Sequence, residues 1–221
     1  MQEQDQDRDQ EQPIFNVPPL TKYLVAVLIG IHILLQVTDR DTIVWIYETF
    51  AFDMTRLVML LDGEGGNWGH LIFTLASHMF LHHDFMHLLI NAFMLMAFGS
   101  MVERYYGVST FISIFLLTGW MGAISEFVVS AESGGILYGA SGAVFGMMGA
   151  TLRLLLPKFG MQKIIGFAAV MMGLNLIIGL TPLAGLLTDG EASISWAAHL
   201  GGFVTGILLS LIFRPLYMVR R

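Results

Sequence analysis

Apolar residues run through the chain in six long segments, which polar or charged stretches separate. A membrane-spanning helix needs about 20 mostly apolar residues, and each segment approaches that length. The pattern therefore predicts an all-α membrane protein built as a bundle of six transmembrane helices. The predicted spans are residues 20–37, 82–99, 109–129, 141–156, 164–180 and 194–213.

The stretch between the first two spans, residues 38–81, is long and not uniformly polar. Residues 54–61 read as a short amphipathic stretch, and residues 70–81 are apolar again but too short to span a membrane. Amphipathic segments of this kind lie in the membrane interface. We therefore predict a long, partly helical, membrane-associated first outer loop.

The composition agrees with a lipid environment, because 55% of the residues are hydrophobic and only 13% are charged. Soluble domains carry about 25% charged residues. The absence of cysteine excludes disulfides, zinc–thiolate sites and cysteine catalysis. The chain has no basic patch with interleaved aromatic residues, so we expect no nucleic-acid partner.

The two ends of the chain differ from the apolar middle. The start, MQEQDQDRDQEQ, is acidic and rich in glutamine, which is typical of a disordered, solvated tail. We therefore divide the chain into a disordered acidic tail (1–19), a six-span membrane domain (20–215) and a short basic tail (216–221).

The basic residues predict an orientation, because cytoplasmic loops carry an excess of lysine and arginine. With the N-terminus inside, only Arg40 and Arg56 of the 11 basic residues lie outside. We therefore expect a multi-pass protein of the cell (plasma) membrane with both termini in the cytoplasm.

Polar groups inside membrane spans are costly, so each one needs an explanation. His87 and Asn91 lie one turn apart in the second span, Ser141 begins the fourth, and His199 lies early in the sixth. These three spans run in the same direction, so at 1.5 Å per residue the groups differ in depth by roughly one to two turns. The spacing predicts one site in the outer half of the bilayer, open to the outer face.

This set of side chains suits nucleophilic catalysis. A serine hydroxyl becomes a good nucleophile when a base takes its proton, and burial favours the neutral imidazole that a base requires. We find no carboxylate at matching depth in the sixth span to orient His199, so we predict a dyad of Ser141 and His199. The backbone N–H of Ser141 and the side chains of His87 and Asn91 are candidate donors to an oxyanion.

Small residues recur at intervals of four in the last part of the chain, where Gly142, Gly146 and Ala150 form one set and Gly202 and Gly206 another. Small residues at this spacing let two membrane helices approach closely. We interpret both sets as packing surfaces.

Three motifs in chain order resemble those of the rhomboid family of intramembrane serine proteases, over residues 38–213. Gly139-Ala140-Ser141-Gly142 is similar to the nucleophile motif, and Ala198-His199-Leu200-Gly201-Gly202 to the motif of the catalytic histidine. The second-span signature His-x3-His-x4-His-x3-Asn is matched by His78, His82, His87 and Asn91.

The resemblance implies a serine endopeptidase that cleaves membrane protein substrates, single-span or polytopic, in or next to their transmembrane segments. It implies that Phe145 stacks on the His199 ring, that His82 helps to retain water, and that Gly139, Gly142 and Gly202 support the site. It implies no cofactor and no metal. One chain suffices for this chemistry, and the oligomeric state stays open.

The chain departs from the family pattern before the second span, where many relatives have Trp-Arg. This sequence has Asn67-Trp68-Gly69-His70 instead. We expect that Arg56 replaces the missing arginine in supporting the first loop.

Two other functions fit parts of the sequence. His78, His82, His83 and His87 lie within ten residues and suggest a metal- or haem-binding membrane protein. A non-catalytic membrane chaperone on the same scaffold would bind client helices without cutting them.

Overall fold

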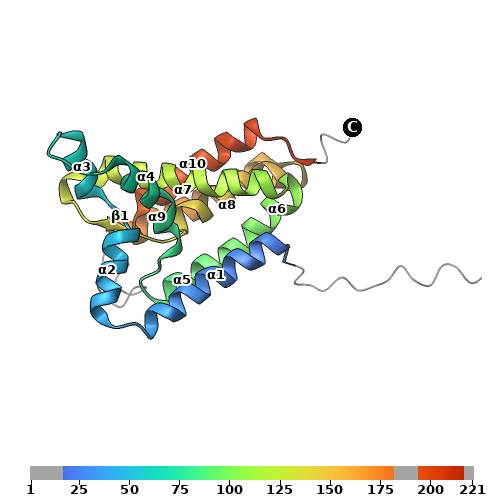
Figure 1. Ribbon diagram of the computed structural model, residues 1–221. Coiled ribbons are helices and arrows are strands. Elements are labelled where there is room, and N and C mark those ends of the chain that lie inside the picture. The colour runs from blue at the N-terminus through green and yellow to red at the C-terminus, as the bar shows by residue number, and fades with distance from the viewer. Residues whose placement is uncertain (1–16, 182–193, 217–221) are drawn as a thin grey trace, which may run out of the picture.

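The computed structural model describes residues 17–181 and 194–216, most of which are helical. The predicted tails, 1–19 and 216–221, lie almost wholly outside the described residues, as does most of the stretch between the last two predicted spans. The helices of the bundle, seen in Figure 1, are α1 (Pro19–Gln36), α5 (Phe85–Met94), α7 (Val108–Ser130), α8 (Ser141–Phe159), α9 (Met161–Leu180) and α10 (Trp196–Ile212).

Four helical stretches in the described residues are long and apolar enough to cross a membrane. They are Pro19–Gln36, Phe85–Tyr106, Val108–Ser133 and Met161–Leu180. The apolar helix α10 is shorter, at 17 residues, and α8 carries Arg153 and Lys158 along its 19 residues. The chain is therefore a mostly helical membrane protein, and the count of six spans stays a prediction.

The second span begins later than residue 82, where the sequence pattern placed its start. The Asp84 carboxylate accepts a hydrogen bond from the backbone N–H of His87 at 2.7 Å and so caps α5, which begins at Phe85. An aspartate at this position satisfies an amide that the helix itself cannot pair. From α5 the chain continues through a π-helical turn, η2 (Leu95–Gly99), into α6 (Ser100–Tyr106).

His78 and His82 consequently lie before this helix and do not share one of its faces. His78 opens a short 3-10 turn, η1 (His78–Phe80), and the chain is extended at Leu81. Their spacing of four residues predicts that they lie one turn apart on a helix, but this prediction is wrong, because η1 ends before His82.

The stretch between α1 and η1 folds into short helices, each capped by a polar side chain. These elements are α2 (Arg40–Phe50), β1 (Phe52–Asp53), α3 (Met54–Leu61) and α4 (Trp68–Ser77). Arg56 donates to the Glu48 carbonyl oxygen at 2.9 Å and pairs with the Asp53 carboxylate at 3.2 Å. It thereby connects α3 to the end of α2.

A two-stranded antiparallel sheet ties this stretch to the segment that precedes α8. Strand β1 pairs with β2 (Ile136–Leu137), with Phe52 opposite Leu137 and Asp53 opposite Ile136. The side chains of Phe52 and Leu137 are both buried. The sheet thereby anchors the short segment that runs from β2 to Ser141.

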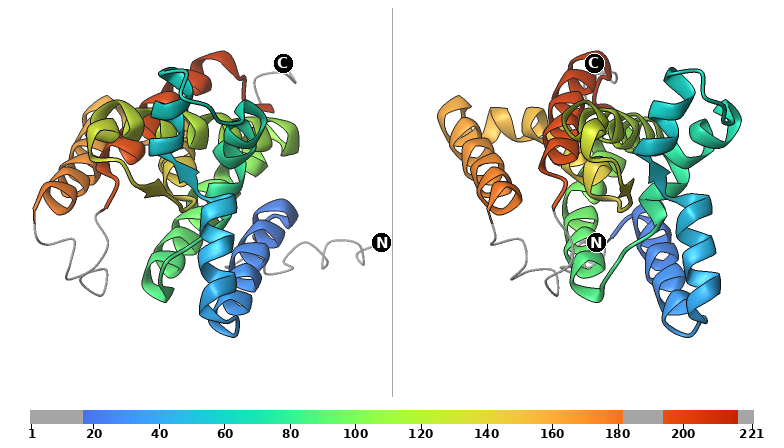
Figure 2. Two further views of the ribbon diagram at one scale, coloured as in Figure 1. Left: turned by 60° about the vertical axis from the view of Figure 1, so that its left-hand side comes forward. Right: turned by 90° about the vertical axis from the view of Figure 1, so that its left-hand side faces the viewer.

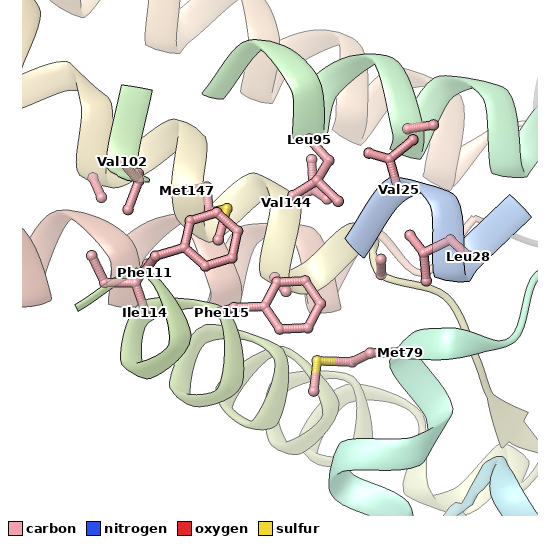
Figure 3. Packing of buried hydrophobic residues seen from close by; sticks show 14 of the residues in the cluster. Val25, Leu28, Met79, Leu95, Val102, Phe111, Ile114, Phe115, Val144 and Met147 are labelled. Carbon is pink, nitrogen blue, oxygen red and sulfur yellow. The ribbon is translucent and has the colours of Figure 1, made fainter. Parts of the chain in front are cut away.

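Helix α8 packs against both α7 and α10, which also pack against each other. A Cβ atom on Gly202 would overlap the carbonyl oxygen of Gly142, and one on Gly206 would overlap that of Gly146. The two glycine sets therefore lie at the contact between α8 and α10. On another side of α8, Met147 lies against the Phe111 ring of α7, and Val144 lies beside Leu95 in the same buried cluster (Figure 3).

Helices α1 and α9 lie at the outside of the bundle. The buried Glu103 carboxylate holds the start of α1, because it accepts hydrogen bonds from the backbone N–H of Leu20 at 3.0 Å and of Thr21 at 2.7 Å. Figure 2 shows α9, in orange, at the edge of the bundle beside α10. Its only buried side chains are those of Ile164 and Asn175.

Candidate active site

Ser141 is the first residue of α8 and is held by the segment that precedes the second span. The backbone N–H of Gly139 donates to the His78 carbonyl oxygen at 2.9 Å, and the N–H of Ala140 donates to Nε2 of His82 at 3.4 Å. Ala140, the N-cap residue, offers no side-chain hydrogen bond. The first amides of α8 therefore have no partner within the helix, which is the usual character of a helix N-terminus.

His199 lies in the first turn of α10, and its ring stacks on the ring of Phe145. The two centroids are 4.3 Å apart and the planes differ by 6°. Phe145 follows Ser141 by four residues, so the two side chains lie on the same face of α8. The stacking therefore places the imidazole over the face of α8 that carries the serine hydroxyl.

Two further helices hold the start of α10. From α7, the buried Glu126 carboxylate accepts a hydrogen bond from the backbone N–H of Ala198 at 3.1 Å and one from the Ser130 hydroxyl at 3.0 Å. From α9, the Asn175 side chain contacts His199, with 2.6 Å between Oδ1 and Nδ1. The first turn of α10, which carries His199, is thus held by Glu126 of α7 and by Asn175 of α9.

His87 lies against the loop before Ser141 because Gly139 leaves room for it. Gly139 has φ +118°, and a Cβ atom there would lie 2.8 Å from Cε1 of His87. Such a backbone conformation is open to glycine and strained for other residues. One turn further along α5, the buried Asn91 donates to the His87 carbonyl oxygen at 2.9 Å, which leaves its second amide hydrogen for another acceptor.

These side chains line one cavity of about 470 Å³ between α5, α8 and α10. Its walls include His87, Asn91, Ser141, Phe145 and His199. The structure thus brings together the residues that the sequence placed at one depth. His82 does not line this cavity; its ring is buried, 5.1 Å from the His87 ring between centroids.

Asn175 and Glu126 are neighbours of His199 that the sequence analysis missed. Asn175 is the only polar side chain between Lys163 and Thr181, and a lone polar group in an apolar span is the signal that identifies such a residue. Glu126 lies late in the third predicted span, where a carboxylate is explained equally well by proximity to the membrane surface.

The histidine-rich segment does not gather into a metal site. No group of three or more His, Asp or Glu side chains within 17–181 and 194–216 could hold a metal ion. His78 bonds to the Thr74 carbonyl oxygen, His82 to the Ala140 amide, and His83 stacks on Tyr138. The rings therefore have separate partners.

Comparison with known proteins gives a consistent result. The rhomboid domain family matches residues 68–216. RHOMBOID-like protein 5 of Arabidopsis thaliana is 31% identical over 156 residues, which cover 70% of this chain and 47% of that protein. Rhomboid protease GluP of Bacillus subtilis (strain 168) is 29% identical over 211 residues, which cover 92% of this chain and 37% of that protein.

A further relative, RHOMBOID-like protein 2 of Arabidopsis thaliana, is 35% identical over 150 residues, which cover 67% of this chain and 45% of that protein. The chain spans about half the length of these relatives, or less. The family match itself covers most of the chain. The chain therefore belongs to the rhomboid family.

Proposed function

We propose that this protein is an intramembrane serine protease in which Ser141 is the nucleophile and His199 the general base. The observation that carries the proposal is the cavity that Ser141 and His199 line together with His87 and Asn91. A hydroxyl, an imidazole and additional hydrogen-bond donors around one cavity are the parts that acyl transfer requires.

In the proposed reaction, Oγ of Ser141 attacks the carbonyl carbon of the substrate peptide bond while Nε2 of His199 takes the hydroxyl proton. The tetrahedral intermediate collapses when the imidazolium returns this proton to the leaving amine. Water then attacks the acyl-enzyme with His199 again as base, which releases the new carboxylate and restores Ser141. No hydrogen bond joins Ser141 to His199 in the described residues; such bonds commonly tighten only when substrate binds.

The negative charge that develops on the carbonyl oxygen needs donors nearby. The N–H of Ser141 at the start of α8 is one, and the His87 ring and the free amide hydrogen of Asn91 are the others. Gly139 contributes by admitting the His87 ring next to the loop. Preorganised donors of this kind account for a large part of the rate of acyl-transfer enzymes.

The substrates we propose are membrane proteins, cut in or next to a transmembrane segment, because two of the stretches that line the cavity, Phe85–Tyr106 and Val108–Ser133, are long and apolar enough to cross a membrane. All proposed groups come from one chain, so a monomer in a lipid bilayer suffices. We place the protein in the plasma membrane with both termini cytoplasmic and the cavity open to the outer face, on the strength of the lysine and arginine distribution.

Reconstitution into liposomes tests the proposal. The wild type should cleave a substrate with a helix-breaking sequence in its transmembrane segment, and a fluorophosphonate probe should label Ser141. Ser141→Ala should abolish both signals, whereas Ser113→Ala, on α7, should retain them. Cleavage that persists in Ser141→Ala overturns the proposal. Binding of the substrate without cleavage or labelling by the wild type would instead identify a non-catalytic chaperone.

A further inference from the structure

The contact between Asn175 and His199 goes beyond a serine–histidine pair. Both side chains are buried, with 6% and 8% of their surface exposed. The oxygen Oδ1 of Asn175 lies 2.6 Å from Nδ1 of His199. This distance is slightly below the usual range of about 2.7–3.2 Å for a hydrogen bond between nitrogen and oxygen.

A second hydrogen bond fixes which way the Asn175 amide faces. Its nitrogen Nδ2 donates to the carbonyl oxygen of Trp196 at 3.0 Å. A carbonyl oxygen only accepts, so the NH2 group must face Trp196 and the oxygen must face His199. The orientation of the amide therefore follows from chemistry.

The protonation of His199 follows from the same reasoning. Oδ1 of an amide cannot donate, so Nδ1 of His199 must carry the proton in this contact. A neutral imidazole with its proton on Nδ1 has an unprotonated Nε2, and that nitrogen is the one able to accept a proton from a serine hydroxyl. The wrong tautomer would leave Ser141 without a base.

We propose that Asn175 is a positioning residue, which holds His199 in the tautomer and orientation that the reaction needs. The inference rests on the proposed protease function. It adds Asn175 of α9 to the proposed pair of Ser141 on α8 and His199 on α10. Asn175 does not touch the reacting atoms. It acts through Nδ1 of His199, in the manner of the third group that orients a catalytic histidine in other hydrolases.

Because Asn175 lies on α9, the orientation of His199 depends on how α9 packs against α10. The other buried side chain of α9, Ile164, packs near the opposite end of the helix against Met148, Leu152 and Phe203. The two hydrogen bonds of Asn175 are therefore a polar connection between the later half of α9 and the first turn of α10. A substitution that removes Asn175 would therefore take away the acceptor that favours the Nδ1 tautomer of His199.

The first test measures the tautomer directly in the wild-type protein. Nitrogen-15 NMR of the imidazole nitrogens in the reconstituted full chain, with the His199 signals identified by their loss in His199→Gln, should show a proton on Nδ1 and none on Nε2. In Asn175→Leu, which has a similar shape and no acceptor, the signals should shift toward a mixture of tautomers. A wild-type spectrum with the proton on Nε2 would overturn the proposal.

The second test separates positioning from general packing. Asn175→Leu should lower kcat by roughly 10- to 100-fold and change KM less than about threefold, because a misoriented histidine impairs the chemical step. Asn175→Asp keeps an oxygen acceptor for Nδ1 in either ionisation state, so it should restore most of the rate. Leu174→Ala, at a half-exposed neighbouring position, should behave as wild type.

The outcomes distinguish this inference from the protease proposal. A loss of kcat in Asn175→Leu that Asn175→Asp fails to relieve, or equal effects of Asn175→Leu and Leu174→Ala, contradicts the positioning role while cleavage by the wild type still supports the protease. If the wild type cleaves nothing and Ser141 is not labelled, the protease proposal fails, and the NMR measurement still decides whether Asn175 fixes the His199 tautomer.

Discussion

Gly142 and Gly202 meet backbone to backbone where α8 crosses α10, one residue after Ser141 and three residues after His199. A Cβ atom on Gly202 would overlap the carbonyl oxygen of Gly142. The obstacle is main chain and cannot rotate aside, so a larger side chain forces the two helices apart. The distance between the proposed nucleophile and base therefore depends on this contact.

Gly202→Ala should consequently destabilise the protein and impair cleavage together. Overpacking of this kind costs about 1–3 kcal/mol, and the displacement also moves His199 relative to Ser141. We expect a lower thermal unfolding midpoint in detergent and a loss of most of the cleavage rate. Gly166→Ala on α9 is the matched control, because its Cβ atom would meet nothing within 4 Å. Equal behaviour of the two variants would show that the helix contact does not constrain the site.

Removing the Phe145 ring should slow the chemical step without unfolding the protein. Aromatic stacking of this kind contributes about 0.5–1.5 kcal/mol beyond the area it buries, so Phe145→Ala should reduce kcat by roughly 2- to 13-fold. Phe145→Tyr keeps the stacked ring and should retain most of the rate. Phe93→Ala, at an exposed position on α5, controls for the general loss of an aromatic side chain; a similar defect there would argue against a specific effect on His199.

The carboxylate of Glu126 should stabilise the first turn of α10. Glu126→Ala leaves the buried N–H of Ala198 without its acceptor, which costs about 1–3 kcal/mol. Glu126→Gln keeps an oxygen in this place and should recover most of that loss. Thermal unfolding in detergent measures both effects, with Glu132→Ala as an exposed control in the turn Ala131–Ser133 that follows α7. A stability of Glu126→Ala equal to that of Glu132→Ala would contradict this role.

Tyr47 should make the stability depend on pH at the alkaline end. Its hydroxyl donates to the His82 carbonyl oxygen at 3.1 Å, and burial, followed by the nearby Tyr138 and Asp84, raises the pKa of Tyr47 to about 12. A pKa raised above the unfolded value of about 10 means that the protonated phenol stabilises the fold. This contribution is complete below pH 10 and is lost as the pH rises toward about 12.

The expected signature is a steeper fall of the unfolding midpoint between pH 10 and about 12 for the wild type than for Tyr47→Phe. Tyr23→Phe, at an exposed position, should retain the wild-type slope. If Tyr47→Phe shows the same slope as the wild type, the Tyr47 hydroxyl does not stabilise the segment at His82.

The sequence predicted the membrane class of the fold and the set of residues around the cavity. Span length and hydropathy depend on local composition, so they identified Ser141, His199, His87 and Asn91 as groups at similar depth. The spacing of the glycines was also visible in the sequence, and the structure places these glycines at the contact between α8 and α10. The start of the second span was misplaced because an apolar run does not reveal that Asp84 caps the helix.

Which helix faces meet, and therefore which side chains contact one another, was decided by the tertiary structure. Hydropathy fixes that a helix lies in the membrane but not its rotation about its own axis, and this rotation determines that Asn175 faces His199 and that Glu126 meets the Ala198 amide. The pairing of β1 with β2 likewise joins segments more than 80 residues apart, for which two-residue strands carry no sequence signal. The cavity residues Ser141, His199, His87 and Asn91 could thus be named from the sequence, whereas the contacts of Asn175 with His199 and of Glu126 with Ala198 required the packing of α9 and α7 against α10.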